Sequence, residues 1–402
     1  MTQAVDLSVK MGNLTLRNPF IVGAGPTMKN LEQIRKAEDN GWGGASIKLA
    51  IDPAPYINLP PRYRWLRRQK IHIFTAETRL TADQSLKLLE QARKVAKEMV
   101  IFPTITYDGE EHEGWAVLAK RFEDAGAQAI ELNMCCPNMS FNLTTTGEPS
   151  TKATGATLGS DLKQLPGVVK LIVDAVNIPI IVKLTPEGGK IAQAAYASIQ
   201  AGAAAVGSTA NRLGIPDIDI YEPMKSIYRL QDQITLGCLS GPWIRPLALR
   251  DTYEMRYYLG KEPFVIGSGG VTDLQSAVRQ IMVGADAIWI CTETIIRGFD
   301  WMPSLLEELE KYMQEMGYRK IGDFRDLLLK NIASAAELRI HEGYAVVEKE
   351  RCNACGLCWN IGHCSAITHP GDTTTVIDPD ECTGCSTCID LCVRGAITMV
   401  KK

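Results

Sequence analysis

Eight of the twelve cysteines lie within the last 51 residues, at spacings typical of metal ligands. They form two runs of the pattern C-x2-C-x2-C, each followed by a fourth cysteine: Cys352, Cys355, Cys358 and Cys364, then Cys382, Cys385, Cys388 and Cys392. Thiolates at this spacing ligate [4Fe-4S] clusters, and in two-cluster ferredoxins the fourth cysteine of each run ligates the other cluster. We therefore predict two clusters, one on residues 352, 355, 358 and 392 and one on residues 382, 385, 388 and 364.

The two runs are offset by 30 residues, and the same offset relates Ala366-Ile367-Thr368 to Ala396-Ile397-Thr398, which indicates an internal duplication. The first run has five residues before its fourth cysteine where three are usual, so His363 is an alternative ligand to Cys364. Zinc is the alternative metal, because paired C-x2-C motifs also build tetrahedral thiolate sites. Three cysteines in one run crowd a single ion but fit three corners of a cubane, which favours iron–sulfur clusters.

Further residues capable of chemistry each follow a short apolar run in the first three quarters of the chain. They are Lys48, Asn133, Cys135, Cys136, Lys183, Ser208 to Asn211, Gly267 to Gly270, Cys291 and Thr292. A lysine can stabilise a developing anion, a thiol can exchange a proton, and glycines let the backbone approach a ligand closely. These residues can act together only if the fold brings the ends of the apolar runs to one place.

The apolar runs number eight and are rich in Val and Ile: residues 20–24, 44–48, 100–105, 129–133, 179–184, 204–208, 263–268 and 287–291. Amphipathic helical stretches separate them, which is the pattern of parallel βα units. Eight such units close a (β/α)8 TIM barrel, whose active site lies at the carboxyl ends of the strands. The alternative α/β fold, a doubly wound sheet, needs G-x-G-x-x-G after its first strand, whereas this chain has GAGPTMKN there.

Two long segments interrupt the barrel pattern. Residues 52–75 are rich in Pro and Arg, and residues 138–160 are rich in Gly, Ser and Thr. Because the second segment follows Cys136 closely, we predict a mobile lid over the site. After helices near residues 303–334 the composition changes, so we predict a barrel domain at residues 1–342 and a ferredoxin-like domain at residues 343–402.

The composition indicates a soluble enzyme. A net charge of -3 with mixed signs provides no basic surface for nucleic acid and no polybasic stretch for a membrane. The N-terminal residues lack the pattern of a signal peptide, and no segment reaches about 18 consecutive apolar residues. We therefore expect a cytoplasmic protein.

Six stretches ahead of the cysteine motif resemble the FMN and iron–sulfur half of dihydropyrimidine dehydrogenases and, more distantly, the class 1 dihydroorotate dehydrogenases. They are NPFIVGAGPT, GWGGASIK, ELNMCCPN, IPIIVKLTP, SGPWIRPLALR and IGSGGV. The resemblance covers nearly the whole chain. It implies an FMN site formed by Gly23, Ala24, Lys48, Asn133, Lys183, Ser208, Gly241, Gly269, Gly270, Val271, Cys291 and Thr292.

Physical reasoning supports several of these implied contacts. The turns at Gly267–Gly270 and Cys291–Thr292 follow the seventh and eighth strands, where barrels of this kind bind phosphate. Lys183 ends a strand and can stabilise the negative charge of reduced flavin near N1 and C2=O. Lys48 should approach the flavin edge near N5 or O4, the alternative being a structural salt bridge.

Cys136 and Lys48 are the expected catalytic residues. Hydride would move between flavin N5 and one alkene carbon, while the Cys136 thiol exchanges a proton at the neighbouring carbon. A thiol with an ordinary pKa of about 8.5 is mostly protonated at neutral pH and can act as an acid. The role of a buried, inert thiol suits Cys135 and Cys238 better.

The substrate-binding residues implied by the resemblance depart from the family pattern. Candidates are Asn133, Cys135, Asn138, Ala210, Asn211 and Glu111. Only Asn133 keeps a ring-binding amide, since Glu187 and Cys135 replace a family Asn and Ser, and Ala210 and Asn211 stand where the family has an Asn-Thr pair. Because an unpaired buried polar group costs about 1–3 kcal/mol, such changes can redirect specificity.

The leading hypothesis is reduction of a carbonyl-conjugated C=C bond, with uracil or thymine as the best single guess. By resemblance, electrons would arrive from an FAD and NAD(P)H subunit or a ferredoxin, and the assembly would be a homodimer or heterotetramer. A second hypothesis is an ene-reductase for a non-pyrimidine substrate, favoured by Glu110, Glu111 and Arg212. A third is an electron-transfer subunit without substrate chemistry of its own.

Overall fold

The computed structural model describes residues 5–53, 58–75, 77–109, 111–136, 154–371 and 374–402. The chain divides into two compact units, Met1–Lys330 and Asn331–Lys402.

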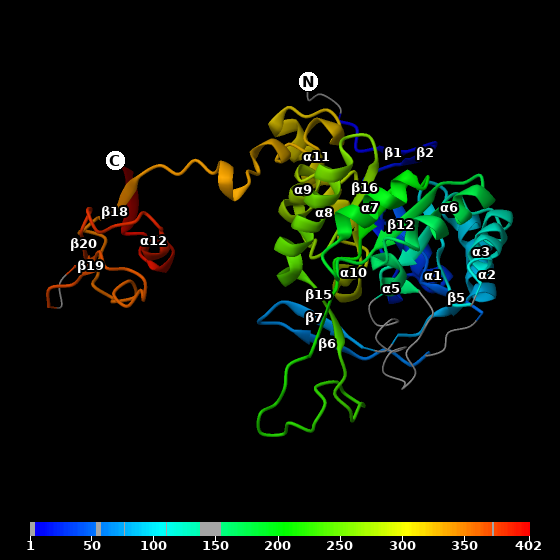
Figure 1. The fold of residues 1–402 in the computed structure, drawn as a ribbon, viewed down its shortest axis with the longest axis horizontal. Helices are drawn as coiled ribbons and strands as arrows, with labels where there is room; N and C mark the ends of the chain where they lie inside the picture. Colours follow the sequence, from blue (N-terminus) through cyan, green and yellow to red (C-terminus); the bar gives the residue numbers. More distant parts are fainter. Residues whose placement is uncertain (1–4, 54–57, 76, 110, 137–153, 372–373) are drawn as a thin grey trace. The chain divides into compact units, whose positions relative to one another are not determined.

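The first unit is a closed barrel of eight parallel strands (Figure 1). In chain order the strands are β3 (Phe20–Val22), β4 (Gly44–Ser46), β9 (Val100–Phe102) continued after Pro103 by β10 (Thr104–Tyr107), β11 (Ile130–Met134), β12 (Ile180–Leu184), β13 (Ala205–Ser208), β16 (Phe264–Ser268) and β17 (Ala287–Ile290). Each strand pairs in parallel with the next, and β17 returns to β3 with Ile288 opposite Phe20, which closes the ring. All eight predicted strands and the predicted barrel are confirmed.

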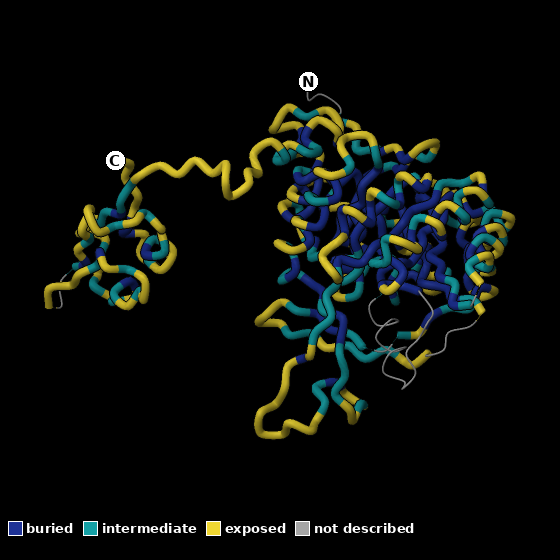
Figure 2. Tube along the Cα trace, in the orientation of Figure 1, coloured by how far each residue is buried: buried dark blue, intermediate teal, exposed yellow. Residues whose placement is uncertain are grey.

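The strands form because their apolar runs are buried on both faces. Every residue of β11, β12 and β16 is buried, as expected for strands with core packing inside the barrel and helices outside it. The helices are α1 (Leu31–Asp39), α2 (Ala82–Val95), α3 (Glu113–Asp124), α5 (Gly155–Ser160), α6 (Leu165–Ala175), α7 (Ile191–Gln200), α8 (Arg245–Leu259), α9 (Leu274–Met282), α10 (Thr292–Arg297) and α11 (Met302–Met316). Figure 2 shows the buried strands surrounded by helices with exposed outer faces.

Local capping fixes where several helices begin. The Asn30 side chain accepts a hydrogen bond from the Gln33 N–H at the start of α1, and Thr81 forms a capping box with Gln84 at the start of α2. Such caps satisfy backbone N–H groups that lack a partner within the helix. They set the points at which the chain leaves each strand-end loop and enters the outer helical layer.

An antiparallel sheet lies beyond one end of the barrel. Its strands are β6 (Tyr63–Leu66), β7 (Ile71–Phe74), β14 (Arg212–Gly214) and β15 (Gly237–Ser240), in the order β14-β15-β7-β6. The short hairpin of β1 (Val9–Met11) and β2 (Leu14–Leu16) lies at the opposite end in Figure 1. Two further strands, β5 (Ala50–Asp52) and β8 (Leu80–Thr81), extend the barrel sheet beside β10. Within the Pro- and Arg-rich interruption, residues 63–74 form the β6–β7 hairpin.

The predicted lid at residues 138–160 lies mostly outside the described residues. Its last part is the helix α5, in which Gly155, Ala156, Leu158 and Gly159 are buried. A Cβ on Gly159 would lie 1.9 Å from the Met134 carbonyl oxygen, so this turn packs directly against β11. The prediction of a mobile lid is wrong for residues 155–160, because an apolar helix face anchors them to the barrel.

The second unit is small and contains the 30-residue internal repeat. Its described residues include the strands β18 (Gly343–Val347), β19 (Ile367–Thr368), β20 (Val376–Ile377) and β21 (Ile397–Lys401), and the α-helix α12 (Thr387–Leu391). β18 pairs with β21 and β19 with β20, both antiparallel. The duplicated alanines, Ala366 and Ala396, are each 1 % exposed, so the 30-residue repeat occupies equivalent buried places. The first strand of this unit begins at Gly343, and the segment before it is exposed.

Among the described residues, no helix is both long enough and apolar enough to cross a membrane.

Candidate active site

A cavity opens at the carboxyl ends of the barrel strands, beneath the antiparallel sheet. About 1140 Å³ of space lies between its walls, part of it open to solvent. Most of the residues expected to bind FMN or substrate line its wall: Gly23, Ala24, Lys48, Asn133, Cys135, Cys136, Lys183, Asn211, Gly241, Gly269, Gly270, Val271, Cys291 and Thr292. Barrel closure thus brings together residues that are up to 269 positions apart.

The glycine turns of this wall leave no room for side chains. Gly269, Gly270 and Gly241 have φ of +97°, +71° and +99°, a region that favours glycine. A Cβ on Gly269 would lie 2.6 Å from the Ala248 Cβ and 2.7 Å from the Ala210 Cβ. These turns therefore present bare backbone to the cavity, and the cradle fits the phosphate-bearing end of FMN.

A buried ion pair joins the fourth and fifth barrel strands. The Lys183 ammonium donates to Glu131 Oε1 at 3.1 Å, and Glu131 also accepts from the hydroxyls of Ser46 at 2.6 Å and Thr104 at 3.2 Å. Burial lowers the pKa of Lys183, but the Glu131 carboxylate together with the nearby Cys135 and Cys291 raises it overall. Lys183 also lies over the Trp289 ring, 4.4 Å from its centroid. The lysine is therefore held as a cation at the cavity wall.

Lys48 forms an ion pair that the sequence did not reveal. Its ammonium contacts the carboxylate of Glu77, and the two side chains are 3 % and 14 % exposed. Glu77 follows the β6–β7 hairpin and also lines the cavity. The salt bridge weighed as an alternative for Lys48 is therefore present, and both of its members face the cavity.

Asn133 shapes the turn that carries the two neighbouring thiols. Its amide oxygen accepts the backbone N–H of Cys136 at 3.0 Å and that of Cys135 at 3.3 Å. Asn133 also lines the cavity, and its amide carries an NH2 group that can donate hydrogen bonds.

The two thiols of this turn differ in their surroundings. Cys135 is buried, and burial raises the pKa of its thiol to about 12. Cys136 is half-buried, lines the cavity and packs against Leu49 and Ile51. Access to the cavity therefore distinguishes Cys136 from its neighbour as a group that can exchange protons with a ligand.

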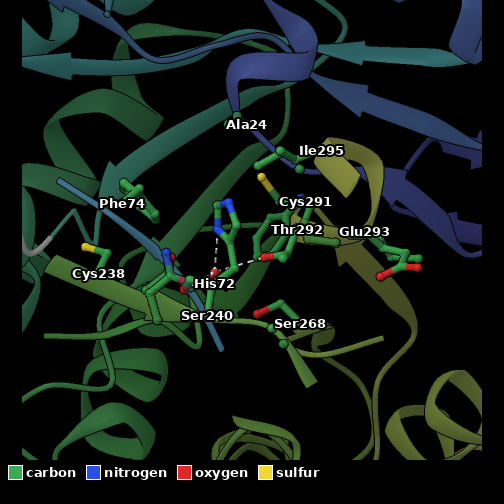
Figure 3. Close-up of a pocket in the computed structure, with 18 of the residues that line it drawn as sticks. Ala24, His72, Phe74, Cys238, Ser240, Ser268, Cys291, Thr292, Glu293 and Ile295 are labelled. Carbon is green, nitrogen blue, oxygen red and sulfur yellow. Dashed lines mark hydrogen bonds between the residues drawn. The ribbon is translucent and has the colours of Figure 1, made fainter. Parts of the chain in front are cut away.

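The antiparallel sheet adds an aromatic wall that the sequence analysis missed. His72 and Phe74 of β7 and Tyr63 of β6 line the cavity, and the His72 ring stacks on Tyr63 with centroids 5.3 Å apart. Figure 3 shows His72 linked to Ser240 and Thr292: the Thr292 hydroxyl donates to Ser240 Oγ at 3.0 Å, and Ser240 Oγ lies 3.4 Å from His72 Nδ1. Burial lowers the pKa of His72 to about 4 despite the nearby Glu77, so the ring is neutral at pH 7.

Three described candidates lie outside this wall. The Ser208 hydroxyl donates to Asp251 Oδ2 at 3.1 Å, the Ala210 carbonyl accepts from Arg212 at 2.7 Å, and Glu111 is exposed near the start of α3. Arg212 itself forms a two-pronged pair with Asp251, at 3.0 Å to each oxygen. The side chains of Ser208 and Arg212 are therefore both hydrogen-bonded to the Asp251 carboxylate. Asn138 and Glu110 lie outside the described residues.

The cysteines of the second unit line two separate cavities. One is bordered by Cys364, Cys382, Cys385 and Cys388, and the other by Cys352, Cys355, Cys358 and Cys392. His363 borders the first cavity, and its Nε2 lies 3.3 Å from Cys385 Sγ. Among the described residues, no three His, Cys, Asp or Glu side chains are arranged to hold one metal ion. The cysteines that line the two cavities are the same two sets that crossed ligation predicts.

Comparisons with known proteins agree with the barrel fold. The model of the family "Dihydroorotate dehydrogenase" matches residues 6–313. The chain is 26% identical over 359 residues to the chloroplastic dihydropyrimidine dehydrogenase (NADP(+)) of Arabidopsis thaliana, covering 86% of this chain and 82% of the relative. It is 26% identical over 367 residues to the NAD-dependent dihydropyrimidine dehydrogenase subunit PreA of Escherichia coli, covering 88% of this chain and 84% of the relative.

A third relative is the catalytic subunit of dihydroorotate dehydrogenase B (NAD(+)) from Thermococcus kodakarensis, which is 31% identical over 331 residues, covering 81% of this chain and 98% of the relative. The family match includes Lys48, which follows β4, as well as Asn133 of β11 and Lys183 of β12. The chain therefore belongs to the dihydroorotate dehydrogenase family and is a flavin-dependent oxidoreductase that acts on CH–CH bonds.

Proposed function

We propose that this protein reduces a carbonyl-conjugated C=C bond, with uracil or thymine to the 5,6-dihydropyrimidine as the best single guess. The observation that carries the proposal is the position of Cys136, a half-buried thiol that lines the same cavity as Asn133, Lys48 and Lys183. Two relatives named for dihydropyrimidine dehydrogenation support the choice of substrate class.

FMN is the proposed cofactor of the barrel. The glycine turns at Gly269–Gly270 and Gly241 would hold its phosphate and ribityl end, and Lys183 would face the part of the ring where negative charge develops. When bound, FMN supplies hydride exchange through its N5 atom.

The residues of this chain would then orient the substrate and move one proton. The Asn133 NH2 group would donate to a ring carbonyl, while Cys136 Sγ would deliver its proton to the substrate carbon next to the one that accepts hydride. A general acid of this kind typically contributes 10²- to 10⁴-fold to the rate, about 2.7 to 5.5 kcal/mol of barrier.

Two [4Fe-4S] clusters are proposed for the second unit, on the cysteine sets that line its two cavities. Electrons would reach FMN through them from a partner subunit carrying FAD and NAD(P)H, or from a ferredoxin. The relatives' names, which include a "subunit PreA" and a "catalytic subunit", support an assembly with a further component. We further propose a cytoplasmic homodimer or heterotetramer that binds no nucleic acid or membrane.

The first test is an anaerobic visible spectrum with flavin and iron analysis, followed by titration with uracil, thymine and dihydroorotate. Replacing Cys136 by Ala should leave FMN bound and reducible while turnover falls by about 10² or more. The conservative variant Cys136→Ser keeps a hydroxyl at the same place and should retain more turnover than C136A. Undiminished turnover in C136A would show that the thiol carries no proton in the reaction.

A second candidate function is an ene-reductase for another cyclic unsaturated carbonyl compound. The observation that favours it is the cavity wall itself, where His72, Tyr63 and Phe74 contribute aromatic surface and Asn133 contributes a ring-binding amide. Turnover of cyclohexenone without turnover of either pyrimidine would favour this candidate over the first.

A further inference from the structure

The charges on the cavity wall are paired in a way that bears on which ligands the cavity accepts. Lys183 is paired with Glu131 inside the barrel, and Lys48 is paired with Glu77 at the cavity surface. His72 lines the same wall as a buried, neutral ring. Each cationic or potentially cationic side chain among these described wall residues is thus either compensated or uncharged.

Glu77 and Glu131 differ in their location and in their burial. Glu131 is fully buried beneath the wall and bonds to three barrel side chains, so it belongs to the structure of the barrel. Glu77 comes from the segment after β7, lines the cavity and retains 14 % side-chain exposure. Its charge also contributes, after burial, to raising the pKa of the Tyr63 phenol and of the Cys291 thiol. The field of this carboxylate therefore extends across the cavity.

We propose that Glu77 is a specificity-determining residue that neutralises Lys48 and so restricts the cavity to uncharged ring substrates. This inference rests on the proposed function and narrows its substrate class. A ligand carboxylate near Lys48 would meet the like charge of Glu77 and would have to displace it from the ammonium. An uncharged lactam or enone ring meets no such opposition, and Lys48 remains a paired donor beside it.

The test uses two probes that share a ring and differ by one carboxylate: uracil, and its 6-carboxylate, orotate. Their dissociation constants are measured anaerobically from perturbation of the oxidised flavin spectrum in the wild type and in Glu77→Gln. Glutamine keeps the size and hydrogen bonding of the side chain but removes its charge. The ratio of orotate affinity to uracil affinity should rise at least tenfold in E77Q, which corresponds to 1.4 kcal/mol.

Three further variants separate this effect from general loosening of the site. Glu77→Asp keeps the charge and should keep the wild-type ratio. Glu98→Gln makes the same substitution in an exposed pair with Arg17 on the outside of the barrel and should change neither affinity. In the double variant E77Q with Lys48→Met the gain for orotate should disappear, because the proposed anion contact is then gone.

A ratio in E77Q within twofold of the wild type would overturn the proposal, as would a gain that survives the loss of Lys48. Benzoate serves as a second probe, since a flat ring carboxylate needs none of the pyrimidine hydrogen bonds. It should bind E77Q at least tenfold more tightly than the wild type, and equal binding would also overturn the proposal. If uracil perturbs no variant, the pyrimidine assignment of the proposed function fails, while the benzoate comparison still decides the role of Glu77.

Discussion

Replacing Glu131 by Gln should destabilise the barrel by about 3–5 kcal/mol. The carboxylate is 0 % exposed and accepts from Ser46, Thr104 and Lys183. Glutamine can accept from one of the two hydroxyls and must donate its NH2 group to the other, and it removes the charge that holds the Lys183 ammonium in the interior. The Trp289 face at 4.4 Å is then a remaining partner of the cation, and a desolvated cation–π contact typically contributes about 2 kcal/mol. The loss is large against a total stability of about 5–15 kcal/mol.

The assay is urea unfolding of the FMN-loaded protein, compared at equal flavin content for the wild type, E131Q and two controls. Glu98→Gln removes a carboxylate from an exposed pair and should cost no more than about 1 kcal/mol. The double variant E131Q with Lys183→Met removes the stranded charge and should recover most of the stability, because an apolar side chain of similar length tolerates burial. It should not recover the stabilisation of reduced flavin, since the cation is absent.

Equal stability of E131Q and E98Q would refute the view that Glu131 compensates a buried cation. A double variant no more stable than E131Q would show instead that the single change acts through packing or through its hydroxyl partners.

Three other predictions test separate parts of the molecule. The pKa of His72 is about 4 in the folded state against an ordinary 6.5, so between these pH values the unfolded chain binds a proton that the folded protein does not. The free energy of unfolding should therefore fall by up to about 3 kcal/mol as pH drops from 6.5 towards 4, and His72→Phe should flatten this slope in pH-dependent unfolding. Gly269→Ala should lose FMN, because its Cβ would collide with Ala248, whereas Gly260→Ala, at φ +78° with nothing within 4 Å, should retain flavin; equal flavin content would refute the role of the turn. Cys364→Ala should lower iron from about eight to about four atoms per chain while His363→Ala should not, and the reverse pattern would make His363 the ligand.

The barrel could be predicted from the sequence because each of its strands has a recognisable local sequence pattern. Runs such as IIVKL and FVIGS are buried on both faces and therefore read as continuous apolar segments. Closure then places the residue at the end of each run near the others, which is how Lys48, Asn133 and Lys183 could be assigned to one site. The limit of this reasoning is seen at Ser208, which ends a strand as expected but donates its hydroxyl to Asp251 of α8.

The wall built by β6, β7 and β15 could not be predicted in the same way. His72 lies opposite Ser240, 168 residues away, and β7 is four residues long, too short for its alternation to be distinguished from loop sequence. The Lys48–Glu77 pair depends on that nonlocal pairing, since β7 sets where the following segment re-enters the barrel. Position after a strand indicates which loop a residue occupies but not which charge will face it.

The two sources of the cavity wall differ in how freely they can change. The turns at Gly241 and Gly269 and the Glu131–Lys183 pair are fixed by close backbone approach and full burial, so most substitutions there damage the barrel itself. The hairpin wall is held by backbone pairing of β7 with β15, which does not depend on the identity of the side chains facing the cavity, although exchange of His72 or Tyr63 would lose their stacking. A fold arranged in this way can keep one flavin chemistry while its ligand changes, and relatives at 26% and 31% identity are indeed named for dihydropyrimidine and for dihydroorotate. Dihydropyrimidine and dihydroorotate differ by a single carboxylate. That carboxylate carries the charge that Glu77, in the segment after the hairpin, opposes.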